Sequence, residues 1–175
     1  GIYDTRRIFY LTNTPSMDIL ISSNLERLLY HLSGGSGKEI RLLMEKLDKE
    51  YHYQVRKDVR EGLKDFYGGY ATVEETNETV GRMYRENGYL IDPHTAVAYK
   101  VYEDYRRETG DNTPTVIAST ASAYKFAESV AKSIGLSEQE DDFRYVEALE
   151  EATGVRIPKG LKDLDKKEIR HKGVI

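Results

Sequence analysis

The chain has 175 residues, of which 39% are apolar and 32% charged, with a formal net charge of −4 and no cysteine. This composition is typical of one globular domain or a large piece of one, and it excludes a disulfide framework and thiolate metal sites. The negative charge argues against a nucleic-acid-binding surface, and no apolar run approaches the roughly 18 residues of a membrane span. We therefore expect a cytoplasmic protein that binds neither membrane nor nucleic acid.

The first third of the chain contains one predicted strand and two predicted helices. Residues 7–12 read as a strand with polar flanks. The polar residues 22–24 can start a helix, and leucines recur at helical spacing over residues 25–32. The glycine-rich segment 33–37 ends that helix, and a second apolar helix face follows over residues 40–51. Both helices should bury their apolar sides.

Two common kinds of ligand site can be excluded from the sequence. Lys38 follows the glycine-rich segment, but the spacing of a phosphate-binding loop is lacking, and Glu39 stands where a magnesium-binding hydroxyl would be. The chain has four histidines, none of them in a zinc-type pair. The sequence therefore predicts neither a nucleotide site of this kind nor a metal site.

A capping box predicts the start of one helix. Thr72 and Glu75 have its spacing, which places that helix start near residue 73.

Local signals near residue 90 place the amino terminus of a second, long helix. Residues 90–91 form a minimal buried strand, Asp92 can cap the next helix, and proline fits its first turn. His94 then lies where backbone N–H groups favour anions. His94 is either a hydrogen-bonded first-turn residue or a catalytic group. The sequence does not decide between these interpretations, because it identifies no carboxylate that would pair with the imidazole.

Residues 113–126 combine a predicted strand, a turn and a helix start. Residues 115–118 are apolar and β-branched behind a proline, as in a buried strand. The hydroxyl-rich turn that follows contains Ser119, Thr120 and Ser122, and ligands of open α/β sheets lie at this end of a strand. Alternatively, Ser119 or Ser122 only caps the next helix. The sequence thus predicts an α/β fold that is helix-rich, with a small partly parallel sheet that includes residues 115–118.

Several motifs together resemble the carboxy-terminal part of threonine synthase. They are Thr-Pro-Ser-Met-Asp-Ile at residues 14–19, Ser-Asn-Leu-Glu-Arg at 23–27, Gly-Tyr-Leu-Ile-Asp-Pro-His-Thr-Ala-Val-Ala at 88–98, and Ile-Ala-Ser-Thr-Ala-Ser-Ala-Tyr-Lys-Phe-Ala at 117–127. Their order and intervals agree over nearly the whole chain, although Ala123 replaces a proline that is frequent in the family. The resemblance implies a fold-type II enzyme that uses pyridoxal phosphate (PLP) to convert O-phosphohomoserine and water to threonine and phosphate.

The resemblance also implies roles for four residues. Thr120 matches the hydroxyl residue that the family directs at the pyridine nitrogen of PLP, and Ser119 is its cofactor-binding neighbour. A neutral hydroxyl, unlike a carboxylate, does not hold that nitrogen protonated, and so moderates the ring as an electron sink. Asp92 and His94 are expected near the active site, at the same end of the sheet.

The resemblance covers only the later part of the enzyme. The family's Schiff-base lysine and its phosphate-binding loop lie earlier, and the contexts of Lys38, Lys100 and Lys125 do not match that lysine. We therefore expect residues 1–175 to be part of the cofactor domain plus the carboxy-terminal helices, with no catalytic residue of their own. Alone, the chain should bind no PLP, be inactive and self-associate through an exposed strand edge. Its partner would be the missing amino-terminal part of the same polypeptide.

A second hypothesis comes from another class of protein. The chain could be a stand-alone helical module whose tyrosine-rich faces bind a protein partner. Its 14 tyrosines and the lack of tryptophan are compatible with such a module but do not select it. The reading frame upstream of Gly1 discriminates between the two hypotheses, because only the enzyme requires a continuation that carries the cofactor lysine.

Overall fold

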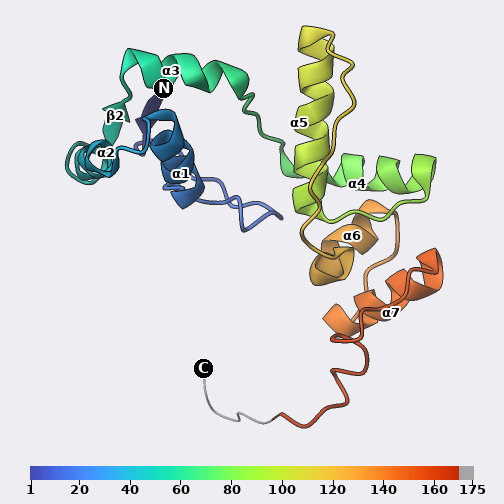
Figure 1. Ribbon diagram of the computed structural model, residues 1–175. Coiled ribbons are helices and arrows are strands. Elements are labelled where there is room, and N and C mark those ends of the chain that lie inside the picture. The colour runs from blue at the N-terminus through green and yellow to red at the C-terminus, as the bar shows by residue number, and fades with distance from the viewer. Residues whose placement is uncertain (170–175) are drawn as a thin grey trace. The chain divides into compact units, whose positions relative to one another are not determined.

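The computed structural model describes residues 1–169, and these fold into two compact units that divide between Gly69 and Tyr70 (Figure 1). The sequence analysis did not predict this division. Each unit has its own apolar core and is described by itself below. Within the described residues, no helix is long and apolar enough to cross a membrane.

The first unit packs three helices beside a two-stranded sheet. Its elements are β1 (Ile2–Asp4), α1 (Ser23–Leu32), α2 (Gly37–Glu50), β2 (His52–Gln54) and α3 (Lys57–Gly62), followed by a 3₁₀ turn at Leu63–Asp65. β1 and β2 are antiparallel, with Tyr3 opposite Tyr53. The core consists of Leu29, Leu43, Leu47, Tyr53, Val55 and Val59. The predicted leucine faces of α1 and α2 both contribute to it.

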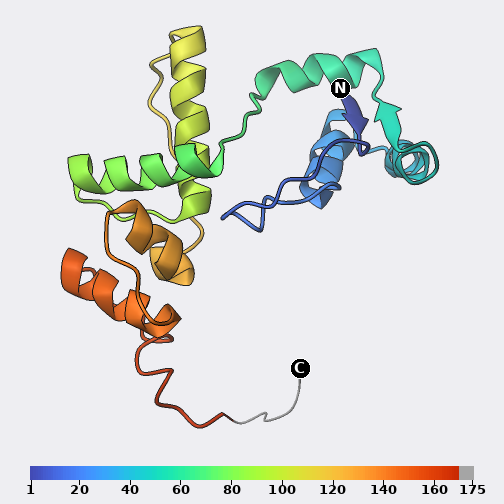
Figure 2. The same ribbon diagram turned by 180° about the vertical axis from the view of Figure 1, so that it is seen from behind.

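The second unit contains four helices over its described residues 70–169 and carries every predicted site residue. The helices are α4 (Val73–Asn87), α5 (Pro93–Thr109), α6 (Ala127–Ser133) and α7 (Asp142–Thr153), with a 3₁₀ turn at Ala123–Phe126 before α6. α6 lies between α4 and α7, as Figure 2 also shows. Buried side chains from all four helices, including Val80, Ala96, Val130 and Leu149, form the core.

Capping residues set the starts of α4 and α5 where the sequence predicted them. Thr72 accepts the Glu75 N–H at 3.2 Å, and the Glu75 carboxylate accepts the Thr72 N–H at 2.8 Å, which completes the capping box. Gly88 ends α4 in the left-handed conformation with φ of 63°. Asp92 caps α5, and Pro93 occupies its first turn.

The helix-rich fold with a small sheet is confirmed, but the sheet differs from the predicted one. It is antiparallel rather than partly parallel, and it joins residues 2–4 to residues 52–54. Residues 115–118 are extended but not in the sheet, and Val116 is 94% exposed. A strand is held by the ladder bonds of a neighbouring strand, and no described segment pairs with residues 115–118. The apolar pattern was therefore not sufficient to make a strand.

Two other predicted strands were also wrong. Residues 7–12 have no regular structure and pair with no described strand, and the backbone N–H of Thr12 donates to Asp18 at 2.7 Å instead of to a ladder. Residues 90–91 are irregular as well. Ile91 is nevertheless buried and packs into the core of the second unit without strand pairing.

Close packing between α4 and α6 predicts a sensitive position. A Cβ added at Gly81 would overlap the backbone carbonyl oxygen of Ser133. We expect Gly81→Ala to lower the free energy of unfolding by about 1–3 kcal/mol, because the helices must move apart. Urea denaturation measures the change. Gly37→Ala is the matched control, since no atom lies within 4 Å of its added Cβ, and a loss as large in this control would contradict the explanation.

Candidate functional site

The predicted site residues come from two segments of the second unit. Asp92 and His94 lie at the amino end of α5, and Ser119 and Thr120 lie in the irregular segment that precedes the 3₁₀ turn. Hydrogen bonds link three of these four residues, since Asp92 contacts His94 directly and Ser119 through Thr95. The sequence alone assigns Thr95 no role.

Asp92 is the buried centre of this arrangement. Its side chain is fully buried and accepts four hydrogen bonds. The backbone N–H of His94 donates to Oδ2 at 3.0 Å, and that of Thr95 donates to Oδ1 at 3.4 Å. The Thr95 hydroxyl also donates to Oδ1. Because a buried carboxylate needs such donors, Asp92 is held firmly and has no surface left for a ligand.

His94 is held by the same carboxylate. Its Nδ1 lies 3.1 Å from Asp92 Oδ2, and a carboxylate only accepts, so this contact places a proton on Nδ1. The imidazole ring packs against the ring of Phe126 with centroids 4.8 Å apart. The sequence analysis left two interpretations of His94 open and found no partner carboxylate. The structure identifies that partner as Asp92, two residues earlier on the chain.

The hydroxyl-rich turn is joined to α5 through Ser119. The Thr95 Oγ1 lies 2.9 Å from the Ser119 Oγ, within hydrogen-bond distance. Ser122 instead accepts the Tyr124 N–H and caps the 3₁₀ turn, so the capping interpretation holds for Ser122 and not for Ser119. Thr120 is exposed, as is Ser119. The turn thus presents the Thr120 side chain at the surface beside an anchored neighbour.

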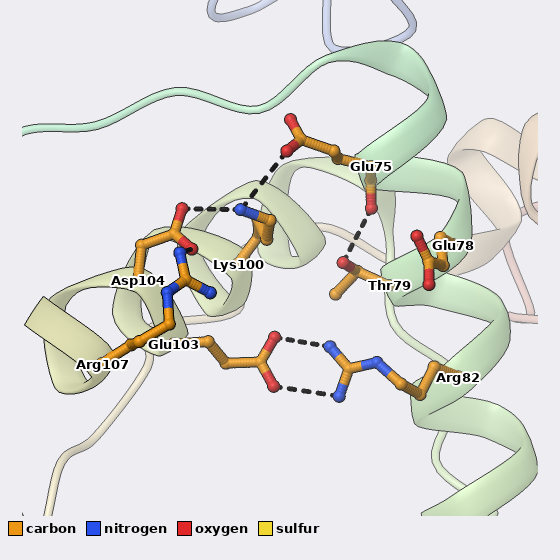
Figure 3. A pocket seen from close by; sticks show the side chains of 8 residues that line it. All are labelled: Glu75, Glu78, Thr79, Arg82, Lys100, Glu103, Asp104 and Arg107. Atoms are coloured by element: carbon orange, nitrogen blue, oxygen red, sulfur yellow. Dashed lines mark hydrogen bonds and ion pairs between the residues drawn. The ribbon is translucent and has the colours of Figure 1, made fainter.

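A second cluster, which the sequence analysis missed, lies between α4 and α5 (Figure 3). It surrounds a charged cleft of about 200 Å³. The cleft is lined by Glu75, Glu78, Thr79, Arg82, Lys100, Glu103, Asp104 and Arg107. Along the sequence these charges look like the solvated faces of two separate helices, and only the crossing of α4 and α5 brings them together.

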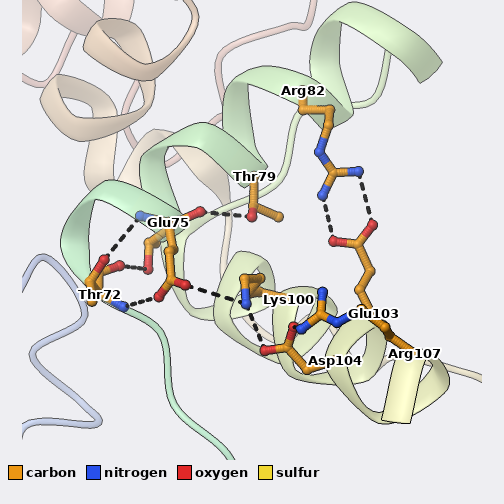
Figure 4. Close-up of polar contacts among 9 residues, drawn as sticks. Thr72, Glu75, Thr79, Arg82, Lys100, Glu103, Asp104 and Arg107 are labelled. Carbon is orange, nitrogen blue, oxygen red and sulfur yellow. Dashed lines mark hydrogen bonds and ion pairs between the residues drawn. The ribbon is translucent and has the colours of Figure 1, made fainter. Parts of the chain in front are cut away.

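Ion pairs cross this cleft and join the two helices (Figure 4). Arg82 forms two hydrogen bonds with the Glu103 carboxylate, at 2.9 and 2.5 Å. Lys100 on α5 lies 3.4 Å from a Glu75 oxygen on α4, and 2.6 Å from an oxygen of Asp104 on its own helix. The hydrogen bond with Asp104 raises the pKa of Lys100, and the bond from Lys100 lowers the pKa of Asp104. We interpret the cluster as a clamp between α4 and α5 rather than as a ligand site, because its basic groups already have acidic partners.

Two of the lysines considered in the sequence analysis lie in this unit. Lys100 is engaged in the clamp, and Lys125 extends over the Phe126 ring, 5.4 Å from its centroid. Lys38 lies in the first turn of α2 in the other unit. Over residues 1–169, no group of three or more histidine, aspartate or glutamate side chains is placed to hold a metal ion.

Comparisons with known proteins point to one family. The family model described as threonine synthase, C-terminal, matches residues 95–174. Human threonine synthase-like 1 is 36% identical over 140 residues, which are 79% of this chain and 18% of that protein. Threonine synthase of Pseudomonas aeruginosa is 39% identical over 121 residues, which are 68% of this chain and 25% of that protein.

A solved structure extends the similarity to the fold. PLP-bound threonine synthase from Brucella melitensis matches 96% of this chain with a TM-score of 0.73 and 32% identity. The match covers 32% of that structure's chain. The chain therefore spans only a fifth to a third of the proteins it matches.

The clamp predicts a pH dependence of stability. Lys100 and then Arg107 hold the pKa of Asp104 below its ordinary value of 3.8. Ionised Asp104 therefore stabilises the fold above pH 3.8, and this contribution is lost as the pH falls through the lowered pKa. We expect Asp104→Asn to lower the melting temperature at pH 7 and to have a smaller effect near pH 3.

Melting curves of the wild type and variant from pH 3 to pH 7 measure this difference. Glu138→Gln is the control, because Glu138 is 83% exposed and its nearest ion-pair partner, Lys132, lies 3.8 Å away. An effect of Asp104→Asn that is equal at both ends of the pH range would mean that the ion pair is not responsible.

Proposed function

Because this chain belongs to the threonine synthase family, in which it matches the carboxy-terminal portion, we propose that it is part of a threonine synthase. The complete enzyme would be a PLP-dependent phospho-lyase that converts O-phosphohomoserine and water to threonine and phosphate. Residues 1–175 would supply part of the cofactor domain and the carboxy-terminal helices. The lack of cysteine supports a cytoplasmic location for this threonine-biosynthetic enzyme.

The exposed hydroxyl of Thr120 beside the anchored Ser119 is the observation that carries this proposal. A group that faces the cofactor ring nitrogen must be accessible and held in place. Asp92 fails the first requirement, because its carboxylate is buried and fully occupied. Thr120 meets both requirements, so the residues present fit a ring whose nitrogen receives a neutral hydroxyl.

Each residue of the site would have a distinct task. Thr120 would hydrogen-bond the ring nitrogen, and Ser119 would bind beside it and keep the turn in place. Asp92 and His94 would hold the amino end of α5 in place, and this helix end would in turn support the hydroxyl-rich turn. The bound cofactor would act as an electron sink. A neutral hydroxyl does not keep the ring nitrogen protonated, so the ring would withdraw electrons less strongly than it would beside a carboxylate.

The remainder of the enzyme would be supplied by the amino-terminal part of the same polypeptide. That part would carry the Schiff-base lysine and the contacts with the substrate phosphate. Large exposed apolar side chains on this chain, such as Leu11 at 82% and Val116 at 94%, would be covered in the complete enzyme. In the isolated chain the same side chains favour self-association.

Substitution of Thr120 in the protein encoded by the complete reading frame tests the proposal. With O-phosphohomoserine as substrate, we expect Thr120→Val to lower kcat about tenfold, because one hydrogen bond to the ring is worth roughly 1.4 kcal/mol. Phosphate release measures the rate. Thr115→Val is the matched control, since Thr115 is an exposed hydroxyl in the same segment that contacts only the Thr113 carbonyl.

Two results would contradict this function. One is an unchanged kcat in Thr120→Val, which would remove Thr120 from the cofactor site. The other is a reading frame that starts near Gly1 and lacks a cofactor-lysine motif, which would favour the helical interaction module.

The isolated 175-residue chain provides a separate test. We expect no stoichiometric lysine adduct after PLP and borohydride treatment, because Lys100 is held by carboxylates and Lys125 lies over an aromatic ring. Mass spectrometry of the peptides measures the yield at each lysine. Stoichiometric labelling of one lysine would show that the chain carries its own cofactor lysine.

A further inference from the structure

The Thr95 side chain connects the buried and the exposed parts of the candidate site. It is 8% exposed and lies at the third position of α5. Its hydroxyl lies within hydrogen-bond distance of two oxygen atoms, an Asp92 carboxylate oxygen, to which it donates, and the Ser119 Oγ. Ser119 is 24 residues later in the chain, so this contact ties the turn to the helix across a long loop.

The turn is anchored on its carboxyl side, where Ala123 and Tyr124 are buried in the core, but the segment before it gives Ser119 little support. Residues 113–118 pair with no described strand, all of them except Ile117 are exposed, and Val116 is 94% exposed. Apolar packing therefore does not hold the chain on the amino side of residues 119 and 120. By contrast, the Asp92 carboxylate at the other end of the Thr95 contact is buried and held by backbone donors of α5. The fixed Asp92 carboxylate can therefore hold the Thr95 side chain in one rotamer. The Thr95 hydroxyl can then hold the Ser119 side chain.

We propose that Thr95 is a positioning residue, which holds Ser119 and thereby orients the Thr120 hydroxyl toward the cofactor ring. This inference rests on the proposed function, because the ring is the target that gives the orientation its purpose. Thr95 does not touch the cofactor itself. Its effect passes from Asp92 through Thr95 to Ser119, and then along one peptide bond to Thr120.

Backbone ¹⁵N relaxation of the 175-residue chain tests the positioning directly. Thr95→Val has nearly the same shape but no hydroxyl, so both hydrogen bonds are lost. We expect the order parameters of Ser119 and Thr120 to fall from a rigid value of about 0.85 to below about 0.6. Thr95→Ser keeps the hydroxyl and should restore the rigid values.

Two further variants separate positioning from general loss of stability. Thr79→Val is the matched control, because Thr79 is a buried helical threonine whose hydroxyl donates to its own helix, at the Glu75 carbonyl. It should leave residues 119 and 120 rigid. Ser119→Ala removes the outer end of the contact at an exposed position, where folding is not at risk, and should loosen Thr120 as Thr95→Val does.

Activity of the complete protein distinguishes this inference from the proposed function. We expect Thr95→Val to lower kcat several-fold with little change in KM, and to add little to Thr120→Val in the double variant. If Thr120→Val lowers kcat but Thr95→Val and Ser119→Ala leave the turn rigid, the positioning inference is overturned and the proposed function stands. If the turn loosens but neither Thr95→Val nor Thr120→Val changes kcat, the proposed function fails, and with it the orientation toward a cofactor.

Discussion

The buried Asp92 carboxylate is the interaction on which the candidate site depends. It caps α5, fixes the His94 ring and holds the Thr95 hydroxyl. Removal of this carboxylate would leave buried backbone donors without acceptors, which costs more than the bonds themselves contribute. One side chain therefore determines where the helix begins and, through Thr95, where the exposed turn lies. A stability role and a positioning role are combined in the same group.

The rest of the second unit keeps the amino end of α5 in place. The Arg82–Glu103 and Lys100–Glu75 ion pairs of the α4–α5 clamp join the two helices, and α6 packs against α4 at Gly81. Tyr124 adds a hydrogen bond to the Val155 carbonyl, which joins the 3₁₀ turn to the segment after α7. The site is thus built on rigid helices, while its exposed turn needs a specific tether.

Features set by neighbouring residues were predictable from sequence, and features set by distant contacts were not. The starts of α4 and α5 follow from the caps Thr72 and Asp92, which act within one helical turn. The pairing of β1 with β2, the α4–α5 clamp and the contact of Thr95 with Ser119 all join residues far apart in the chain. Residues 115–118 illustrate the same limit, because their pattern predicts a strand but cannot supply the neighbour that a strand requires.

The most direct test of the central claim is a crystal structure of the complete protein with PLP bound. The account predicts that the Thr120 Oγ1 lies about 2.7–3.2 Å from the pyridine nitrogen, within hydrogen-bond distance. It also predicts that Ser119 keeps its contact with Thr95 in that structure. A pyridine nitrogen that faces a carboxylate, or a Thr120 hydroxyl that points away from the ring, would contradict the account.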